Sequence, residues 1–540
     1  MHHVLRRTAA ALAVPALSLS ALGAIPAPAQ AAVDPAPAAA SAAWLAGQVP
    51  ASGLFTGEYG TQHGLSIDVA LGLHAAGGDA ATVTRIRDAV AADVDKYIAY
   101  SYQDEKGVTH TGEVGGATAK VLVLSQRVGG DEHAFGGVDL VDRLESLVDD
   151  SGRVISTFDG APDPSYDNTY IQALATEGLR GTGSAAYADV VGYLLDQQCA
   201  DGYFRGDIPA APGAQSCQDD APDTDSTALA VLALAADEGT PGVDEALAEA
   251  ESWLLETQRP NGSFGGGPST EAPNANSTGL AAWALGTLGE TDAAEDAAAW
   301  VRAHTATNVA NCVSYAAADL GAIAYDDAAL GSIRGTAIDA ATRGQFLLAT
   351  AQALPALNWA PAGTGDPHAL FAAEYVRAGG FKPVGVIDAA PGEALCAMLG
   401  EQSVLGYADR NGEAQLRVRI PATTGTSRVT VADAAGTVGT VRIRALGAKR
   451  LPFTLKSRVP VGAKQVIKVK GLAAGELVSI SITWPSKPSS GSGESAAGQA
   501  NNKGVFAIST KVPNRPGKAT VKIRGQFANR KAAGSFTVTR

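Results

Sequence analysis

Between about residues 42 and 404 the apolar positions follow a helical spacing, and the pattern repeats about every 50 residues. Each period holds two helical segments. The first is amphipathic and charged, as in residues 243–258, and the second is apolar almost all round, as in residues 278–289. A helix that is apolar on all sides must be buried. Six such pairs predict an all-α toroid, an α6/α6 double ring of six inner and six outer helices. An open solenoid with capping repeats is the alternative.

Two series of residues mark this repeat. The charged segments carry an aromatic or large apolar anchor, in the order Trp44, Tyr97, Leu144, Tyr193, Trp253 and Trp300. The apolar segments open near a serine or threonine, in the order Ser66, Thr118, Thr169, Thr227, Thr278 and, less regularly, Thr342. Glycine follows these segments, which is a common signal for the end of a helix.

After Val404 the pattern changes to an alternation of apolar and polar residues, which is typical of β-strands with one buried face. The strand-like segments are residues 415–420, 428–432, 440–445, 464–472, 477–484, 504–510, 519–525 and 535–539. They predict a short β module over residues 405–447 and a β-sandwich over residues 448–540. The Ser- and Gly-rich stretch 487–502 is expected to be a long loop. The second module is similar in composition to immunoglobulin-like domains of exported bacterial proteins.

The first 31 residues have the pattern of a secretory signal peptide. Arg6 and Arg7 precede an apolar run, and Ala29-Gln30-Ala31 offers a cleavage site between small residues. The arginine pair leaves both the general and the twin-arginine export routes open. No later segment has the length and apolarity of a transmembrane helix. We therefore expect a secreted, extracellular protein that can associate with the cell envelope.

Four cysteines follow this segment, at Cys199, Cys217, Cys312 and Cys396. Export favours disulfides over free thiols, and the local pairs predict Cys199–Cys217 and Cys312–Cys396. A metal site is disfavoured, because no Cys-x2-Cys spacing occurs and no histidine lies three to five residues from a cysteine. We expect no bound metal.

Composition excludes global disorder, because 46% of the 540 residues are hydrophobic and 18% are charged. The net charge of −14 argues against nucleic acid as a partner. The charge is unevenly distributed. Residues 405–540 contain 23 Lys and Arg against five Asp and Glu, a net charge of +18, whereas residues 32–404 have 16 against 50, a net charge of −34. The basic strands can serve solubility, bind an anionic envelope polymer or dock onto the acidic ring.

A loop motif recurs between the paired helices. Gln198 to Phe204 and Gln258 to Phe264 both have the pattern Gln-x3-Gly-x-Phe, and Gln48 to Phe55 is a looser copy. This repeat resembles that of the terpenoid-cyclase and protein-prenyltransferase superfamily, whose fold is an α/α toroid. The resemblance covers roughly residues 42 to 400. We expect the glycine to allow the turn, the aromatic ring to fill the gap between units, and the glutamine to bind N-terminal amides of the next helix.

In such a ring all inner helices run in one direction, so their N-termini share one rim. That rim is the expected ligand site, for a small molecule or an envelope component. The candidate ligand-binding residues are His63, His110, Tyr166, Asp167, Asp223, Asp225, Asn274 and Asn276, with Asp68, Glu113 and His368 nearby.

Residues Asp223 to Ala228 are similar to the Asp-x-Asp-Asp-Thr-Ala motif of squalene-hopene-type cyclases. The resemblance implies that Asp225 is the catalytic general acid, but Ser226 departs from the motif. Helix capping is the alternative, because residues 274–278 place asparagines in the same frame and both residue types are good N-caps. The acidic cluster Asp219, Asp220, Asp223 and Asp225 fits either a Ca²⁺ site or a solvated loop.

Aromatic residues are only 6% of the chain, which is little for a cavity that must stabilise carbocations. No Asp-x-Cys pattern matches the zinc ligands of the prenyltransferases, and we expect no cofactor. The favoured hypothesis is an exported, monomeric, non-catalytic binding protein with a basic tail for envelope association. The alternatives are a terpenoid-cyclase-like enzyme that uses Asp225 and a cell-surface interaction protein with the toroid as scaffold.

Overall fold

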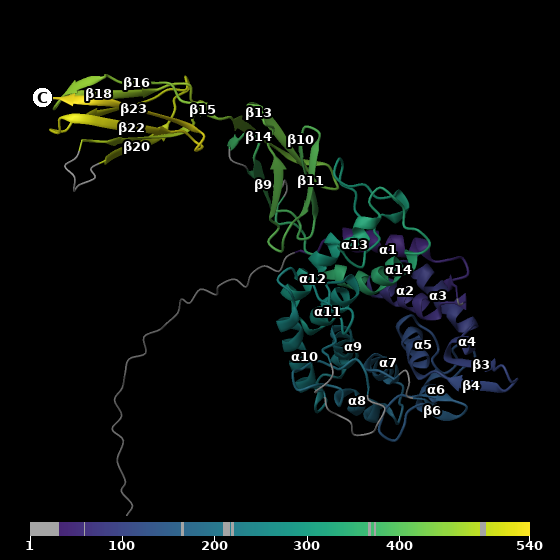
Figure 1. The fold of residues 1–540 in the computed structure, drawn as a ribbon. Coiled ribbons are helices and arrows are strands. Elements are labelled where there is room, and N and C mark those ends of the chain that lie inside the picture. The colour runs from purple at the N-terminus through teal and green to yellow at the C-terminus, as the bar shows by residue number, and fades with distance from the viewer. Residues whose placement is uncertain are drawn as a thin grey trace, which may run out of the picture.

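The structure is a computed structural model that describes residues 32–58, 60–163, 167–208, 217, 221–365, 369–371, 374–485 and 493–540. Figure 1 shows a ring of helices followed by two β modules arranged in a row. The predicted signal segment, residues 1–31, lies outside the described residues. No helix among the described residues is long and apolar enough to cross a bilayer.

Six inner helices form the ring. They are α2 (His63–Ala75), α5 (Gly115–Arg127), α7 (Thr169–Leu179), α9 (Thr224–Leu234), α11 (Ala275–Leu288) and α14 (Arg343–Ala353). Each contacts the next, and α14 packs on both α11 and α2, so the ring is closed rather than an open solenoid. The outer helices are α1 (Ala36–Gln48), α3 (Ala80–Ala92), α6 (Leu140–Glu145), α8 (Tyr187–Leu195), α10 (Val243–Thr257) and α12 (Thr291–Ala303).

Short elements complete the ring. They are β1 (Thr56–Gly57), β2 (Gly60–Thr61), α4 (Asp95–Ile98), β3 (Ala99–Gln103), β4 (Thr109–Glu113), β5 (Ser156–Phe158), β6 (Ala161–Asp163), η2 (Ala235–Asp237), η3 (Ala317–Asp319), α13 (Asp327–Ser332) and η4 (Leu354–Trp359). Strands β3 to β6 form one antiparallel sheet beside α4 and α5. Helix η4 continues α14 and packs on α11 and α12.

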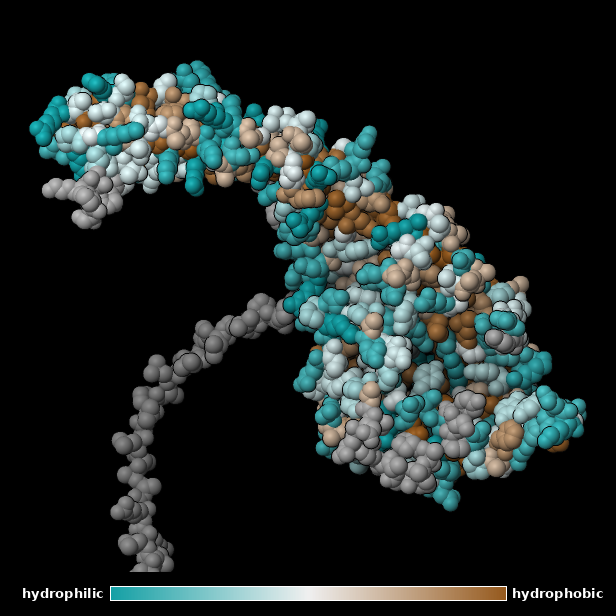
Figure 2. Space-filling view, viewed as in Figure 1, coloured by the Kyte–Doolittle hydropathy of each residue, from teal (hydrophilic) through white to brown (hydrophobic). Residues whose placement is uncertain are grey.

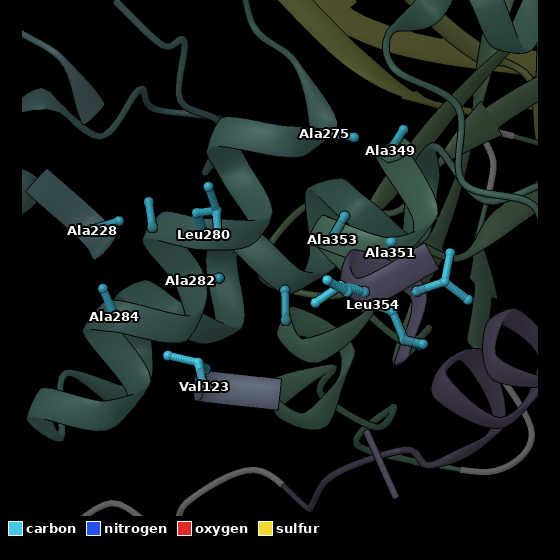
Figure 3. Close-up of a cluster of buried hydrophobic side chains, with 14 of the residues drawn as sticks. Val123, Ala228, Ala275, Leu280, Ala282, Ala284, Ala349, Ala351, Ala353 and Leu354 are labelled. Atoms are coloured by element: carbon cyan, nitrogen blue, oxygen red, sulfur yellow. The ribbon is translucent and has the colours of Figure 1, made fainter. Parts of the chain in front are cut away.

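Small side chains dominate the contacts between inner helices. Figure 3 shows alanines of α9, α11 and α14 in one cluster with Leu280, Val123 and Leu354. Alanine allows close helix approach, and the closest contacts use glycine. A Cβ atom on Gly72 would lie 2.2 Å from the Ala351 carbonyl oxygen, and one on Gly279 would lie 2.4 Å from Ala353 Cα. The ring is therefore close-packed where α14 seals it.

The serine and threonine series has a structural role. The hydroxyl groups of Thr227 and Thr278 each accept a 3.0 Å hydrogen bond from the backbone N–H of the motif phenylalanine, Phe204 and Phe264. Ser66 does the same for Phe55. Burying the aromatic residue of each loop thus leaves no backbone donor unpaired.

Two units make this bond with a residue outside the series. In the sixth unit the bond is made by Thr350, which accepts from Ile323, whereas Thr342 bonds Asp339 before α14 begins. Thr227 and Thr278 are the fourth residues of their helices, whereas Thr350 is the eighth residue of α14, about one helical turn further from the helix start. In the third unit Gln172 accepts from Val154 N, a bond that Thr169 does not make.

The motif glutamines bind carbonyl groups, not the N-terminal amides that we expected. Gln258 Nε2 donates to Gly262 O (3.2 Å) and to Ala293 O (2.9 Å) in the first turn of α12. Gln198 makes the equivalent pair of bonds, to Gly202 and to Ala246 of α10. The loop places each carboxamide NH2 group, which has two N–H donors, between two carbonyl oxygens, its own loop's and one in the first turn of the next outer helix.

One glycine in most units touches the next outer helix. A Cβ atom on Gly262, whose φ is +83°, would lie 2.2 Å from Asp296 O of α12. The glycines with this role are Gly53, Gly152, Gly202, Gly262 and Gly321. Gly321 contacts Ala40 of α1, so the last unit meets the first by the same contact that joins the others.

The first β module begins earlier than predicted. Its strands are β7 (Ala369–Phe371), β8 (Tyr375–Arg377), β9 (Phe381–Ile387), β10 (Ala394–Leu399), β11 (Gln402–Tyr407), β12 (Ala414–Arg419), β13 (Gly425–Ala432) and β14 (Thr437–Leu446). They form two sheets, in the orders β11-β10-β13-β14-β8 and β12-β9-β7. The boundary placed at Val404 therefore falls inside β11. Strand β10 is buried along most of its length and shows no polar alternation, so its sequence resembles a buried helix segment.

The second module is a sandwich of two further sheets. Its strands are β15 (Lys449–Arg450), β16 (Phe453–Thr454), β17 (Arg458–Pro460), β18 (Lys464–Val469), β19 (Leu477–Thr483), β20 (Gly493–Gln499), β21 (Phe506–Lys511), β22 (Gly517–Arg524) and β23 (Arg530–Thr539). The stretch expected to be a long loop thus contains a strand, β20, which pairs with β19. Its side chains are mostly exposed, so no apolar alternation marks it.

Both predicted disulfides are present. Cys199 pairs with Cys217, and Cys312 pairs with Cys396. The second disulfide joins the last unit of the ring to β10 and so connects the ring covalently to the first β module. Two disulfides fit an oxidising compartment.

Candidate functional site

The inner rim is built on helix caps. Asp223 Oδ1 accepts from Ser226 N (2.8 Å) at the start of α9, and Asn274 Oδ1 accepts from Ser277 N (2.9 Å) at the start of α11. Asn168 caps α7 in the same way. These side chains satisfy N–H groups that the helix geometry leaves unpaired. Asp223 and Asn274 therefore position the rim and have part of their bonding capacity committed.

Asp225, two residues after the cap of α9, is placed differently. Burial raises the pKa of its carboxyl to about 6; Ser277 lowers this pKa and the neighbouring Asp223 carboxylate raises it further. Its Oδ1 atom is buried and has no hydrogen-bond partner among the described residues. This buried carboxyl oxygen can therefore accept a hydrogen bond from a ligand.

The neighbouring helix supplies two more polar side chains, Asn276 and Ser277. Asn276 occupies in α11 the position that Asp225 occupies in α9, and its Nδ2 donates to Gln352 Oε1 (2.5 Å) on α14. Asn276 Oδ1 is buried without a partner in the described part of the chain, and the buried Ser277 hydroxyl lies beside the Asp225 carboxyl, whose pKa it lowers. Ser277 is buried, with 1% of its surface exposed. We refer to Asp225, Asn276 and Ser277 as the rim cluster.

A glycine-rich loop covers one side of the rim cluster. A Cβ atom on Gly266 would lie 2.9 Å from Ser277 Oγ and 3.2 Å from Asp225 Oδ2, and one on Gly267 would lie 2.2 Å from Asp223 Oδ2. Any other residue at these positions would press on the polar groups. The loop can therefore approach the carboxylates only because it lacks side chains.

A second polar group lies across the ring and is internally paired. Lys120 Nζ is 2.7 Å from Asp68 Oδ1 and lies 5.9 Å from the centre of the Tyr170 ring. Burial lowers the pKa of Lys120, but Asp68 and the neighbouring tyrosines more than offset this, and the net pKa is raised. Lys120 therefore stays charged, and Asp68 is held as its counter-ion.

The centre of the ring is narrow. Its cavity has a volume of about 80 Å³ and is lined by side chains of all six inner helices. Ligand pockets usually measure ~300–1,000 Å³. Within it Arg127 pairs with Glu177 and lies 5.2 Å from the Trp283 ring. This space suits a few waters or a small group, and it is far below what a long isoprenoid chain needs.

Several candidate residues are paired elsewhere. His63 stacks on Tyr97 and lies 2.9 Å from Asp93, and His110 lies 2.7 Å from Asp159 on the β3–β6 sheet. Buried Asp167 pairs with Arg153 at 3.0 Å, and burial raises the pKa of Asp167 to about 6 despite this partner. Glu113 pairs with Arg143. Tyr166, His368, Asp219 and Asp220 lie outside the described residues.

Of the predicted rim residues, Asp223, Asp225, Asn274 and Asn276 lie at the starts of the adjacent helices α9 and α11, whereas His63, His110 and Asp167 are each paired with another residue. Sequence reasoning missed Ser277, Gln352 and Lys120. Lys120 had a visible signal, a single cation inside an otherwise apolar helix. Within the described ranges no group of three or more His, Cys, Asp or Glu is placed to hold a metal ion.

No family model matches this sequence. No curated protein matches it either. Among solved structures, the type II terpene cyclase MstE from Scytonema is 14% identical, over 60% of this chain and 97% of its own, with a TM-score of 0.39. The unsaturated glucuronyl hydrolase from Bacillus sp. GL1 is 12% identical, over 59% of this chain and 94% of its own, with a TM-score of 0.39.

The adhesin InvE from Yersinia pseudotuberculosis is 15% identical over 32% of this chain, with a TM-score of 0.17. This chain spans 59% of the length of InvE. At such identities and scores none of these proteins transfers an activity, a substrate or a partner to this chain.

Proposed function

We propose that this chain is an exported binding protein whose helical ring holds a small molecule rich in hydrogen-bond donors, such as a polyol or an amine, at the rim cluster. One observation carries the proposal: Asp225 Oδ1 and Asn276 Oδ1 are buried polar atoms without a partner among the described residues, and they lie beside the buried Ser277 hydroxyl. A buried polar group left unpaired costs ~1–3 kcal/mol, which a ligand donor would recover. The carboxylate and carboxamide oxygens are acceptors, so the ligand must supply N–H or O–H groups.

The surrounding charge supports the same ligand class. Residues 32–404 have a net charge of −34, and the Asp225 carboxyl has the Asp223 carboxylate as its neighbour. A second anion at this point would be repelled, whereas a hydroxyl or ammonium group would be attracted. The glycine-rich loop at Gly266 limits the ligand to a compact group.

A thermal-shift screen of polyols and amines on the full exported chain tests this proposal. A ligand at 100 times its Kd stabilises the folded state by ~2.7 kcal/mol. The stabilisation should be lost in Asp225→Asn and retained in Asp196→Asn, a matched change at an exposed residue at the end of α8. Native mass spectrometry of the secreted protein should show a co-purifying small molecule. Binding that survives Asp225→Asn, or no binder and no co-purifying mass, would reject the proposal.

A second candidate function is a cyclase-like reaction with Asp225 as the general acid. The observation that favours it is the pKa of about 6, which keeps part of the carboxyl protonated near neutrality. The narrow ring centre and the serine at Ser226 weigh against it. Incubation with linear isoprenoids decides the matter: a cyclised product from wild type and none from Asp225→Asn supports the enzyme, and no product from either excludes it.

The two β modules complete the proposal. We assign to them the association of the protein with the cell envelope, because their excess of cations is compatible with an anionic partner. In the structure the second module lies at the far end of the molecule from the acidic ring (Figure 1). Its basic surface is therefore not covered by the ring and is open to another partner.

A further inference from the structure

Five exposed cations of the second β module line one groove. The groove lies where β15, the end of β22 and the start of β23 meet, and it is lined by Lys449, Arg450, Lys522, Arg524 and Lys531. All five side chains are exposed. None of them forms an ion pair with any described residue, and Lys449 donates only to the Gly471 carbonyl oxygen. Figure 2 shows hydrophilic residues over much of the visible surface of this module.

Like charges face each other across the strands of this groove. Lys531 on β23 is directly paired in register with Arg524 on β22 and with Arg450 on β15. Like charges at directly paired positions destabilise a sheet. Single like-charge pairs also occur elsewhere, at Lys464–Lys511 and Arg428–Arg442, but here three neighbouring strands carry a continuous row of cations, and an anion bound between the side chains would relieve their repulsion.

The nearby acid cannot neutralise them. Glu476 is fully buried, and its two oxygens accept from Arg530 Nε (2.6 Å) and Arg530 Nη2 (2.7 Å). The Ala473 N–H also donates to Glu476. Its bonding capacity is used inside the module. The charge of the groove is thus left for an external partner.

The lining favours one class of polyanion. It contains two arginines, whose planar guanidinium groups suit phosphate oxygens, and no aromatic residue. Aromatic side chains are the usual platform for nucleic-acid bases, and they are common in pockets that bind sugars. Exposed hydroxyls such as Ser479, Ser481 and Thr520 lie on the same sheet face instead.

We infer that this groove binds a linear phosphodiester polymer of the cell envelope, one that carries its charge in the chain backbone and has no bases. The inference deepens the proposed envelope association and rests on it. Successive outward residues of one strand lie ~7 Å apart, two rises of ~3.3 Å, so Lys522 and Arg524 form a row along which neighbouring phosphates can be bound.

Binding of the full exported chain to immobilised poly(glycerol phosphate) at physiological ionic strength tests the inference. The triple variant Lys522→Ser, Arg524→Ser and Lys531→Ser should bind at least tenfold more weakly. The matched control removes three cations from the outer face of the other sheet, Lys464→Ser, Lys468→Ser and Lys511→Ser, and should stay within twofold of wild type. The salt dependence of log K should become shallower by ~2 in the groove variant only, at ~0.7 per phosphate contact.

Other results would overturn the inference. Equal losses in the two variants would mean that net charge, not the groove, governs binding. Tighter binding to a uronic-acid polysaccharide or to single-stranded DNA would assign a different polymer. Sedimentation with isolated envelopes distinguishes the failure of this inference from the failure of the proposed envelope association. If the protein sediments with envelopes but does not bind poly(glycerol phosphate), only the phosphodiester ligand is rejected. If it binds neither, both proposals are rejected. Circular dichroism of each variant confirms that the sheets have folded.

Discussion

Replacing Gly262 by alanine should destabilise the helical ring. This glycine has a φ of +83°, and its carbonyl oxygen accepts a hydrogen bond from the motif residue Gln258. An alanine at positive φ costs ~1–2 kcal/mol. The new methyl group would also lie 2.2 Å from Asp296 O, where ordinary contacts are 3.4–4 Å. The backbone of α12 must then move by roughly 1 Å, and overpacking of this kind costs ~1–3 kcal/mol.

The two costs together predict that the free energy of unfolding falls by ~2–5 kcal/mol. Gly239→Ala is the matched control, because Gly239 has a φ of +90° and no atom within 4 Å of its Cβ position. The control should lose only the conformational part, ~1–2 kcal/mol. Guanidinium unfolding followed by circular dichroism at 222 nm measures both, since the helices belong to the ring. Equal destabilisation by the two substitutions would refute the argument that loop glycines join neighbouring units.

Three further predictions follow from buried charges and from the disulfides. The pKa of Asp225 is about 6 against an ordinary 3.8, so the folded ring binds this proton more tightly, and Asp225 alone should lower the free energy of unfolding by up to ~3 kcal/mol as the pH rises from about 4 to 6. Asp167 shares this raised pKa, so Asp225→Asn should roughly halve the fall measured by denaturation at several pH values, and an unchanged profile would contradict the burial of Asp225. Glu476→Ala leaves Arg530 buried without its counter-ion and should destabilise the second β module by ~3–5 kcal/mol. The loss is measured as a lower unfolding midpoint in the fluorescence of Trp484, in a chain that lacks the other tryptophans. The double variant Cys312→Ala and Cys396→Ala opens a loop of 84 residues and should lower the free energy of unfolding by ~4–5 kcal/mol. Removing the Cys199–Cys217 disulfide, which closes a loop of 18 residues, should lower it by ~3 kcal/mol. Equal losses in denaturant unfolding would contradict this dependence on loop length.

The helical periodicity was enough to predict paired helices and their order, because a helix buried on all sides is apolar over its whole surface. It did not reveal Thr350, since the offset of α14 is a property of the closed ring and not of one segment. Strands β10 and β20 were not predicted, because neither shows an alternation of apolar and polar residues. Both faces of β10 are largely buried and both faces of β20 are largely exposed, so the two faces of each strand have similar residues. Such strands are defined by hydrogen bonds to a neighbouring strand, and these cannot be predicted from the residues of the strand itself.

The candidate site was predictable as far as it depends on helix ends. Asp225 and Asn276 share a position in two repeats, and that position lies at the rim in any closed ring. The role of Ser277 could not be predicted, because its hydroxyl becomes buried only when the Gly266 loop lies over it. His63 and His110 were plausible ligands in the sequence and proved to be bound to Asp93 and Asp159, which lie 30 and 49 residues away in the chain.

The seal between α14 and α2 has a consequence for how the chain acquires its structure. Gly72 and Ala351 touch across the full length of the ring sequence, and Val33 pairs with Pro361 beside them. A chain that emerges N-terminus first therefore presents α1 and α2 with one apolar flank bare until nearly all of the ring has been delivered. Contacts of such long range form slowly and leave apolar surface open to association in the meantime. Closure of the ring is therefore expected to come late in folding, after residues at both ends of the ring sequence have met.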